Sequence, residues 1–400
     1  MSKQNGKNTT EKDLFHYLTR KDKSRFDESI INNWYIARKY VQDKLEDVII
    51  GPESGEHLHA VIYDDMRDEM MLCVLRQVAL SAHYANFDEV FDDEGGQVVY
   101  KCKNRSVITF VTDRESLEQE LKKEEYLCNL LDYCEYSVFG GEPKHKESYL
   151  DIELHIVSAH PTSQTNNEIV KEMKREDLAC LESRTDVREI DTRKAVYADR
   201  MYHLGDEIGN LPAEDIHNAH RYQQALDKFQ YVIMAEPWKP MVDNNEWNKN
   251  LSAVKEALSN LFCADCFESR KRGIEQSWEK EKEKKKKGEG DKSLKNVFDI
   301  WEKYNEALSR SEHARWMVEK FIMGYRIMDT CERLKFESYL GQKRKSYLKS
   351  LKKNASDPAH IDLCSYHDLR RVDPDNMKYD SFLMLAIPKI LEKTKLHEKK

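Results

Sequence analysis

Residues 107–111, Val-Ile-Thr-Phe-Val, decide the fold class most clearly, because they predict a buried β-strand. β-branched and aromatic residues fill the run, and no Gly or Pro interrupts it. A similar run, His59-Ala-Val-Ile-Tyr63, precedes it in the chain. Tyr149–Val157 follows it and alternates aliphatic with polar residues, which is the period of a strand. These patterns predict three strands separated by long intervals.

Helical patterns fill both intervals between the predicted strands. Hydrophobic residues recur at helical spacing over Met66–Ala82 and again over Ser116–Leu131. Strands that alternate with helices predict a small parallel sheet of Rossmann type, in three layers. The fold class expected for the whole chain is α/β plus all-α, with a small Rossmann-like parallel sheet followed by a helical domain.

The second part of the chain is dominated by helical patterns. Helices are expected near 191–208, 214–235, 249–272, 294–328, 332–353 and 377–392. The run 279–292, EKEKEKKKKGEGDK, predicts a solvated helix end that leads into an exposed loop. We therefore expect a disordered tail at 1–13, a Rossmann-like α/β domain at 14–165 and a helical domain at 166–400.

The composition argues against several classes of protein. The chain has 400 residues and a formal net charge of −8, whereas a general nucleic-acid binder is normally strongly basic. No apolar run approaches the length of a membrane-spanning helix, and residues 1–13 lack the apolar core of a signal peptide. Nine cysteines, an odd number, fit reduced thiols better than a disulfide framework. We expect a cytoplasmic protein.

Signatures of catalysis are weak in the predicted α/β domain. It lacks G-x-G-x-x-G, although Asp64, Asp65 and Asp113 follow strands at positions where carboxylates often meet ribose hydroxyls. A degenerate Rossmann-like fold used for oligomer contacts is favoured over a nucleotide site. Ser81 and His83 end a helical pattern and have no assigned third partner, so no hydrolase is predicted.

Two motifs of the helical domain have ordinary structural explanations. Cys263 and Cys266 have the spacing of half a zinc site, but their helical setting favours structural thiols, so no metal is expected. The basic run 343–353, KRKSYLKSLKK, predicts a solvated helix face. If that helix lies over residues 312–320, Arg344 or Lys345 would meet a phosphate.

Residues 309–325, Ser-Arg-Ser-Glu-His-Ala-Arg-Trp-Met-Val-Glu-Lys-Phe-Ile-Met-Gly-Tyr, predict an amphipathic helix with an unusual polar side. At about 100° per residue, five side chains suited to a polar ligand share one broad arc. They are Glu312, His313, Arg315, Trp316 and Lys320. Hydrophobic residues fill the opposite arc, which we expect to face a core. The polar arc predicts contact with something polar, flat and anionic.

A structural interpretation of this arc stays open. Glu312, Arg315 and Glu319 have the i,i+3 and i,i+4 spacing of ion pairs on one helix face. Trp316 would then pack against a helix that begins near Ser365. In this interpretation the polar arc serves the fold and contacts no ligand.

The same helix resembles the RyR domain, the repeat of ryanodine receptors that also occurs in many bacterial proteins. The resemblance rests on Glu312-His313-x-Arg315-Trp316, with Gly324 and an aromatic residue further on. A second motif lies downstream, His360-x-x-Leu363-x-x-Tyr366-x-x-Leu369, and Tyr379-Asp380 precedes a final helix. Two spaced motifs in the same order make the match specific.

The resemblance covers roughly residues 294–392. At Tyr325 the chain departs from the family, which more often has Trp there, so the aromatic surface remains but the indole N–H is lost. Outside this part, Arg76–Asp88 and the segment Gly209–Asp215 are also similar to the bacterial proteins that carry the domain. The similarity therefore extends, with less specificity, over much of the chain.

The resemblance implies a module that senses nucleotide-derived signals such as ADP-ribose-like molecules. Trp316, Tyr325 and Tyr366 would stack a purine. Arg315 would bind a phosphate bidentately with Lys320 as a point charge, and Glu312 would accept hydrogen bonds from ribose. The residues expected at the site are Glu312, His313, Arg315, Trp316, Lys320, Tyr325, His360, Tyr366, Tyr379 and Asp380.

We therefore expect a cytosolic, non-enzymatic sensor or effector of bacterial antiviral defence that binds a nucleotide-derived small molecule and needs no cofactor. Binding would bias a homo-oligomer or a partner, such as a membrane effector or another defence protein. Two alternatives stay open. The chain would be a regulatory subunit of an ion channel, or a nucleotide hydrolase or transferase in which Glu312 or Glu319 acts as general acid or base.

Overall fold

The computed structural model describes residues 37–38, 40–63, 69–92, 97–102, 104–112, 125–138, 150–158, 262–352, 354 and 357–398. By their contacts, the residues form two compact units. The first takes its residues from Met1–Ile49, Cys180–Asn305 and Lys378–Lys400, and the second from Ile50–Ala179 and Glu306–Met377. The predicted strands and the 309–325 segment all belong to the second unit.

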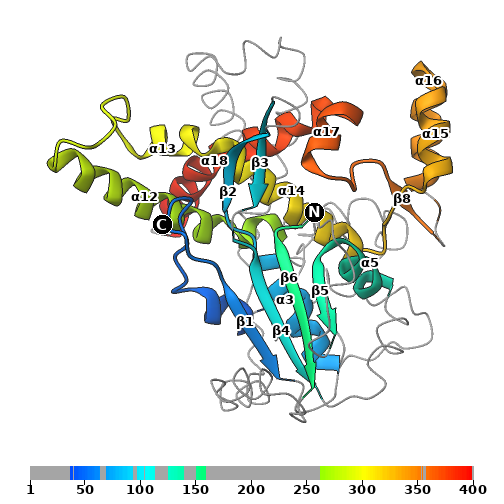
Figure 1. The fold of residues 1–400 in the computed structure, drawn as a ribbon, viewed down its shortest axis with the longest axis horizontal. Coiled ribbons are helices and arrows are strands. Elements are labelled where there is room, and N and C mark those ends of the chain that lie inside the picture. Colours follow the sequence, from blue (N-terminus) through cyan, green and yellow to red (C-terminus); the bar gives the residue numbers. More distant parts are fainter. Residues whose placement is uncertain are drawn as a thin grey trace, which may run out of the picture. The chain divides into compact units, whose positions relative to one another are not determined.

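A four-stranded parallel sheet lies in the second unit (Figure 1). Its strands are ordered β1 (His59–Tyr63), β4 (Ser106–Thr112), β6 (Ile152–Ser158) and β5 (Glu135–Val138). Only Val107 of β4 is not fully buried, as expected for a central strand covered on both faces. The three predicted strands are confirmed. The fourth strand, β5, was not predicted, because four residues carry little periodic signal.

Helix α3 (Glu69–Ser81) packs against β1 and β4, and its apolar side chains from Leu72 to Leu80 are buried. It confirms the helix expected over 66–82. The described part of the second expected helix is α5 (Glu125–Tyr133). An antiparallel hairpin of β2 (Phe87–Asp92) and β3 (Gln97–Cys102) was missed, because the acidic residues of β2 disfavour a strand by propensity alone.

The helical part of the second unit follows the sheet in sequence. Its elements are α14 (Asn305–Ile322), β7 (Arg326–Ile327), α15 (Thr330–Ser338), α16 (Gly341–Lys352), β8 (Ala359–His360) and α17 (Tyr366–Val372). The short strands β7 and β8 pair in parallel. Met328, Phe336, Ala359 and Ile361 form a small buried core around this pair.

Two helices that the pattern predicts as continuous are each divided. The stretch 294–328 contains α13 (Val297–Lys303) and α14, separated at Tyr304. The stretch 332–353 is interrupted after Ser338, and α16 starts at Gly341, whose φ of 52° lies in the left-handed region. Glycine adopts that conformation without the steric penalty of a Cβ, so the break is encoded by one residue.

Gly324 ends α14. The Tyr325 N–H donates to Lys320 O (2.9 Å) and the Gly324 N–H to Phe321 O (2.8 Å), the two bonds of a Schellman motif. Gly324 has a φ of 78°, which this motif requires at the residue after the cap. The chain then reverses into β7, which brings Tyr325 close to the last turn of α14.

The first unit is helical in its described part. It contains helical residues 40–45, α12 (Phe267–Lys286), α13 and most of α18 (Pro374–Glu398). Arg38 and Gln42 both donate to the Asp265 carboxylate, with Gln42 Nε2 at 2.8 Å. The basic end of α12 extends to Lys286 and is mostly exposed, which confirms the solvated helix end expected in the run 279–292.

Together the two units combine a parallel α/β sheet with helical segments, which confirms the fold class at that level. Several expectations fall outside the described residues. They are the tail at 1–13, the boundary near 165, the helices near 191–208 and 214–235, the segment Gly209–Asp215, and Asp64, Asp65 and Asp113. These stay predictions.

Candidate ligand site on α14

Most of the residues expected at the ligand site lie in the second unit. Five are on α14, Tyr325 is in the turn that follows, His360 is on β8 and Tyr366 begins α17. Tyr379 and Asp380 lie on α18 at positions that belong to the first unit. The eight residues of the second unit form two sets that differ in burial and in chemistry.

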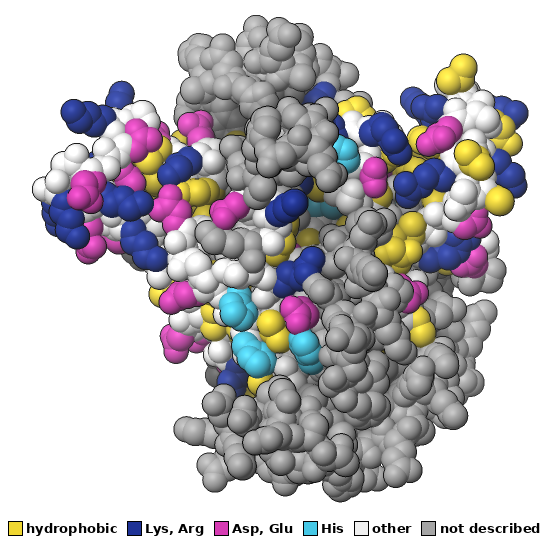
Figure 2. All heavy atoms as spheres, viewed as in Figure 1, with side chains coloured by type: hydrophobic (Ala, Val, Ile, Leu, Met, Phe, Trp, Pro, Cys, Tyr) yellow, Lys and Arg dark blue, Asp and Glu magenta, His cyan; other side chains and the backbone are white. Residues whose placement is uncertain are grey.

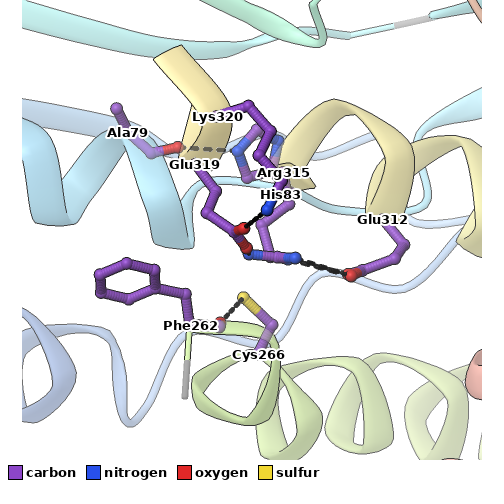
Figure 3. A network of polar contacts seen from close by, with 8 residues as sticks. All are labelled: Ala79, His83, Phe262, Cys266, Glu312, Arg315, Glu319 and Lys320. Carbon is purple, nitrogen blue, oxygen red and sulfur yellow. Dashed lines mark hydrogen bonds and ion pairs between the residues drawn. The ribbon is translucent and has the colours of Figure 1, made fainter. Parts of the chain in front are cut away.

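The first set is a buried ion network along α14 (Figure 3). Arg315 donates from Nε and Nη2 to the Glu312 carboxylate at 2.9–3.1 Å, and from Nη1 to Glu319 Oε2 at 2.8 Å. Lys320 Nζ donates to the other oxygen of Glu319 at 2.6 Å. The side chains of Glu312, Arg315 and Glu319 have no exposed surface.

This network corrects the expected orientation of the polar arc. Glu312, His313 and Arg315 of the polar arc lie in the interior, so the arc as a whole does not face solvent or a ligand. A guanidinium that is fully buried between two carboxylates has no surface to offer a phosphate, and Glu312 has none to offer ribose. The i,i+3 and i,i+4 ion pairs of the structural interpretation are the arrangement that the structure shows.

The buried network also bears on an enzymatic role for Glu312 or Glu319. A general acid or base must come within hydrogen-bond reach of the substrate. Both carboxylates accept hydrogen bonds from Arg315 and have no exposed surface. Their placement supplies a structural role, because each charge is neutralised where water is excluded.

The second set is an aromatic cluster formed by His313, Trp316, Tyr325, His360 and Tyr366. The His313 and Trp316 rings stack with centroids 5.8 Å apart, and Tyr366 meets His313 edge-on at 5.5 Å. His360 stands edge-on to Trp316 at 5.0 Å and to Tyr325 at 6.0 Å. The cluster joins the two sequence motifs, which lie almost fifty residues apart, into one site.

His313 is held neutral at the base of the cluster. Its Nε2 lies 3.0 Å from the backbone oxygen of Cys364, which only accepts hydrogen bonds, so Nε2 carries the proton and donates. Burial lowers the pKa of His313 to about 4, against the weaker opposing effects of that bond and of Glu312. A neutral ring that is buried and bonded in this way supports its neighbours without adding charge.

His360 presents a free N–H at the edge of the cluster. The Asp362 backbone N–H donates to His360 Nδ1 at 3.3 Å, so the proton of the neutral ring is on Nε2. Burial, followed by the charges of Lys352 and Lys320, holds the pKa of His360 well below its usual value. Among the described residues Nε2 has no hydrogen-bond partner, and the side chain is 11% exposed.

Trp316, Lys320 and His360 together form the open edge of the cluster. Trp316 and Lys320 are partly exposed, whereas Arg315, the residue before Trp316, is fully buried. Lys320 Nζ lies 5.3 Å from the centre of the Trp316 ring. Within the described part of the chain the Trp316 indole N–H donates to no protein acceptor. The open edge therefore offers two N–H donors beside an ammonium group.

Tyr325 and Tyr366 are mostly buried in the cluster and expose little ring surface for stacking. They are 9% and 7% exposed, and the Arg310 guanidinium lies 4.7 Å from the Tyr366 ring centre. Of the three rings expected to stack on a purine, only Trp316 therefore has an exposed surface suited to this role. Arg310 was missed, although its position three residues before His313 on the same helix face would have shown it.

His83 resembles half of a catalytic dyad but is placed as a structural group. Its Nδ1 lies 2.6 Å from Asp151 Oδ1 and its Nε2 lies 2.7 Å from the Ala79 backbone oxygen. A general base needs one nitrogen free to take a proton, and both are engaged in a fully buried ring. The His83–Asp151 pair links the end of α3 to the residue before β6. Asp151 is thus the partner of His83 that the sequence did not reveal.

Cys263 and Cys266 are both buried, and the Cys266 thiol donates to the Phe262 backbone oxygen at 3.8 Å. In the described ranges no group of three or more His, Cys, Asp and Glu side chains is placed to hold a metal ion.

Among the residues that the structure describes, none of the helices has the length and apolar character needed to cross a membrane. Arg344 lies on α16, donates to Tyr339 O (2.7 Å) and has its guanidinium 4.6 Å from the centre of the Phe336 ring, so these contacts are with α15 and the turn that follows it.

No protein-family model, curated protein or solved structure matches the chain.

Proposed function

We propose that the chain is a non-enzymatic sensor that binds a nucleotide-derived small molecule at the open edge of the aromatic cluster. The observation that carries the proposal is the trio of donors at Trp316, Lys320 and His360. Phosphate, carboxylate and carbonyl oxygens of a nucleotide are acceptors, and such groups bind to N–H donors and ammonium ions. The exposed part of the Trp316 ring would meet the base or sugar.

The chemistry of the edge favours a ligand that carries a negative charge. Both histidines of the cluster are neutral near pH 7, so they do not add to the positive charge of Lys320. One ammonium beside two neutral donors suits a phosphate or carboxylate oxygen without excessive desolvation. Lys320 is already paired with Glu319, so the ligand would share this ammonium instead of displacing a fully buried ion pair.

The resemblance to the RyR domain supports the same assignment. The cluster contains the residues of both motifs, namely His313 and Trp316 from the first and His360 and Tyr366 from the second. The α/β sheet would be Rossmann-like and serve assembly, which is supported by its four parallel strands and by α3, which packs against β1 and β4. In this account ligand binding biases a homo-oligomer or a partner, as in a bacterial defence sensor.

The test follows melting temperature and product formation together while the full chain is incubated with NAD, ADP-ribose and cyclic nucleotides. A ligand at a hundred times its dissociation constant should add about 2.7 kcal/mol to the free energy of unfolding. Stabilisation without turnover supports a sensor. Multiple-turnover product release would show an enzyme, and no shift with any compound would remove the support for a nucleotide-derived ligand.

Trp278 provides a matched control for the site. It lies on α12 in the other unit, is partly exposed, and has Lys282 and Lys285 at 5.9 and 5.3 Å from its ring centre. It therefore repeats the Trp–Lys pair of Trp316 without the histidines. Trp316→Phe should weaken binding of the stabilising compound, whereas Trp278→Phe should leave binding unchanged.

A further inference from the structure

A basic hairpin projects from the small core around β7 and β8. It consists of α15, the turn at Tyr339 and Leu340, and α16, and thus spans Thr330–Lys352. Seven Lys and Arg and only two Glu occur in this span, in a chain whose formal net charge is −8. Figure 2 shows Lys and Arg side chains intermixed with hydrophobic ones over these two helices.

One of the two acidic residues is already neutralised. Glu332 accepts hydrogen bonds from Arg326 Nη1 at 2.7 Å and Nη2 at 2.9 Å, and these bonds lower its pKa. Arg326 lies on β7, outside the hairpin. The exposed charge of the hairpin is therefore almost entirely positive, with Glu337 as the remaining acid.

The hairpin has one inner face and one outer face. Tyr347, Leu348 and Leu351 of α16 pack on the buried core that contains Phe336. At about 100° per residue, Lys345 and Lys349 lie on the opposite side of α16. Both are exposed, so the anchoring face and the charged face are separate.

Exposed leucines accompany this charge. Leu334 is 60% exposed and Leu340 is 76% exposed, and Ile49 is the only other large hydrophobic residue exposed in the described part of the chain. Leu334 is on α15 and Leu340 is in the turn, so both lie among the basic residues. Apolar side chains ringed by Lys and Arg are the composition of surfaces that lie on anionic bilayers.

The aromatic rings of the hairpin are poorly placed for nucleic acid. Lys343 Nζ lies 4.0 Å from the centre of the Tyr339 ring, and Tyr347 meets that ring edge-on at 5.3 Å. Phe336 is buried with the Arg344 guanidinium 4.6 Å from its ring centre. Bases need an open ring face for stacking, and these faces are covered by cations or by the core.

We propose that the basic hairpin binds the anionic surface of a lipid bilayer, with Leu334 and Leu340 entering the headgroup region and the lysines meeting lipid phosphates and carboxylates. The inference does not depend on the ligand proposed for the aromatic cluster. It gives the chain a peripheral membrane contact at a place that is separate in sequence from the Trp316 motif.

The test measures sedimentation of the full chain with vesicles of phosphatidylcholine alone or of phosphatidylcholine with phosphatidylserine. We expect binding only to the anionic vesicles, and its loss as ionic strength rises well above ~0.15 M. Neutralising Lys343, Lys345 and Lys349 with Gln should lower the partition coefficient at least about tenfold. Replacing Leu334 and Leu340 with Ser should lower it about tenfold at unchanged charge.

Lys284, Lys286 and Lys287 near the end of α12 provide the matched control, because they are equally exposed and their change to Gln removes the same charge. That control should stay within about twofold of the wild type, since acidic residues flank its four consecutive lysines on both sides and no exposed large hydrophobic residue lies among them. Equal binding to both vesicle types, or equal loss in both lysine variants, would overturn the proposal. Binding to a homopolymer RNA through the hairpin lysines without vesicle binding would overturn it in favour of nucleic acid.

Discussion

Two sides of helix α14 carry similar residue types and do different things. On one side, Glu312, Arg315 and Glu319 form ion pairs with no exposed surface. On the other, Trp316 and Lys320 stay partly open beside His360. Arg315 and Trp316 are consecutive residues, so their side chains point about 100° apart around the helix axis. The difference teaches that one polar arc on a helix can contain both a buried ion network and a partly exposed surface, to which we assign ligand binding.

The largest expected effect breaks the buried side. Arg315→Met leaves Glu312 and Glu319 in the interior without their main partner, so the free energy of unfolding should fall by about 3–5 kcal/mol. Denaturant unfolding of the full chain measures this change. If Arg315 instead served a ligand, its removal would leave stability unchanged in the absence of ligand.

A compensated variant sharpens that result. Glu312→Met, Arg315→Met and Glu319→Met together remove the charges while keeping side-chain volume, and buried ion pairs replaced by hydrophobic residues of similar volume are often neutral for stability. The triple variant should recover most of the loss caused by Arg315→Met alone. A triple variant as unstable as the single one would contradict the explanation by unpaired charge.

The second effect is a pH dependence that arises from His313. Its pKa is about 4 in the folded chain and its ordinary value is 6.5, so the unfolded chain binds more protons between these values. The stabilising contribution is complete above the ordinary value and is lost as pH falls toward the folded value. We expect the free energy of unfolding to decrease by about 2 kcal/mol between about pH 7 and about pH 5.

His313→Gln isolates this contribution. Glutamine can still donate to the Cys364 oxygen but does not titrate, so the variant should lose stability less steeply over the same pH range. His360 shifts in the same direction and would keep part of the slope in the variant. Identical pH profiles for the variant and the wild type would show that His313 does not titrate as its burial predicts.

The third effect concerns the open edge. Trp316→Phe keeps an aromatic ring beside Lys320 but removes the indole N–H. Because a hydrogen bond contributes about 0.5–1.5 kcal/mol, affinity for the stabilising compound should fall about 2- to 10-fold. Titration calorimetry measures the affinity, with Trp278→Phe as the control. A large loss of stability in Trp316→Phe without ligand would place Trp316 among the core residues.

The smallest effect concerns the turn between α14 and β7. Gly324 has a φ of 78°, and a Cβ in the left-handed region is unfavourable by about 1–2 kcal/mol. Gly324→Ala should therefore lower the free energy of unfolding by about 1 kcal/mol, and Gly324→Asn by less. Equal stability of the alanine variant would show that the turn relaxes easily.

Sequence patterns predicted the elements with strong local signals. The strands β1, β4 and β6 and helix α3 follow from hydrophobic runs of the right period. The break at Gly341 and the division at Tyr304 were missed, because periodic apolar residues continue across both. Strand β5 and the β2–β3 hairpin were missed because they are short or rich in acidic residues.

The candidate site was predictable in its members but not in its arrangement. A helical wheel places Arg315 and Trp316 on one broad arc, yet it contains no information on what covers each part of that arc. Contacts distant in sequence supply it: His360 reaches Trp316, and Tyr133 of α5 stacks on Phe321 of α14 at 5.4 Å. Spacing alone did predict the ion pairs of Arg315, as one of two interpretations.

The central claim is that the open edge, and not the buried network, binds the ligand. The direct test is the ligand-induced stabilisation of the double variant Trp316→Phe/His360→Phe beside that of the charge-free triple variant. At a hundred times the wild-type dissociation constant, losing two hydrogen bonds that each contribute about 2- to 10-fold in affinity should reduce stabilisation from about 2.7 kcal/mol to between about 1.9 and about 0.4 kcal/mol. The triple variant should keep nearly all of it. Full stabilisation in the double variant with loss in the triple variant would contradict the claim.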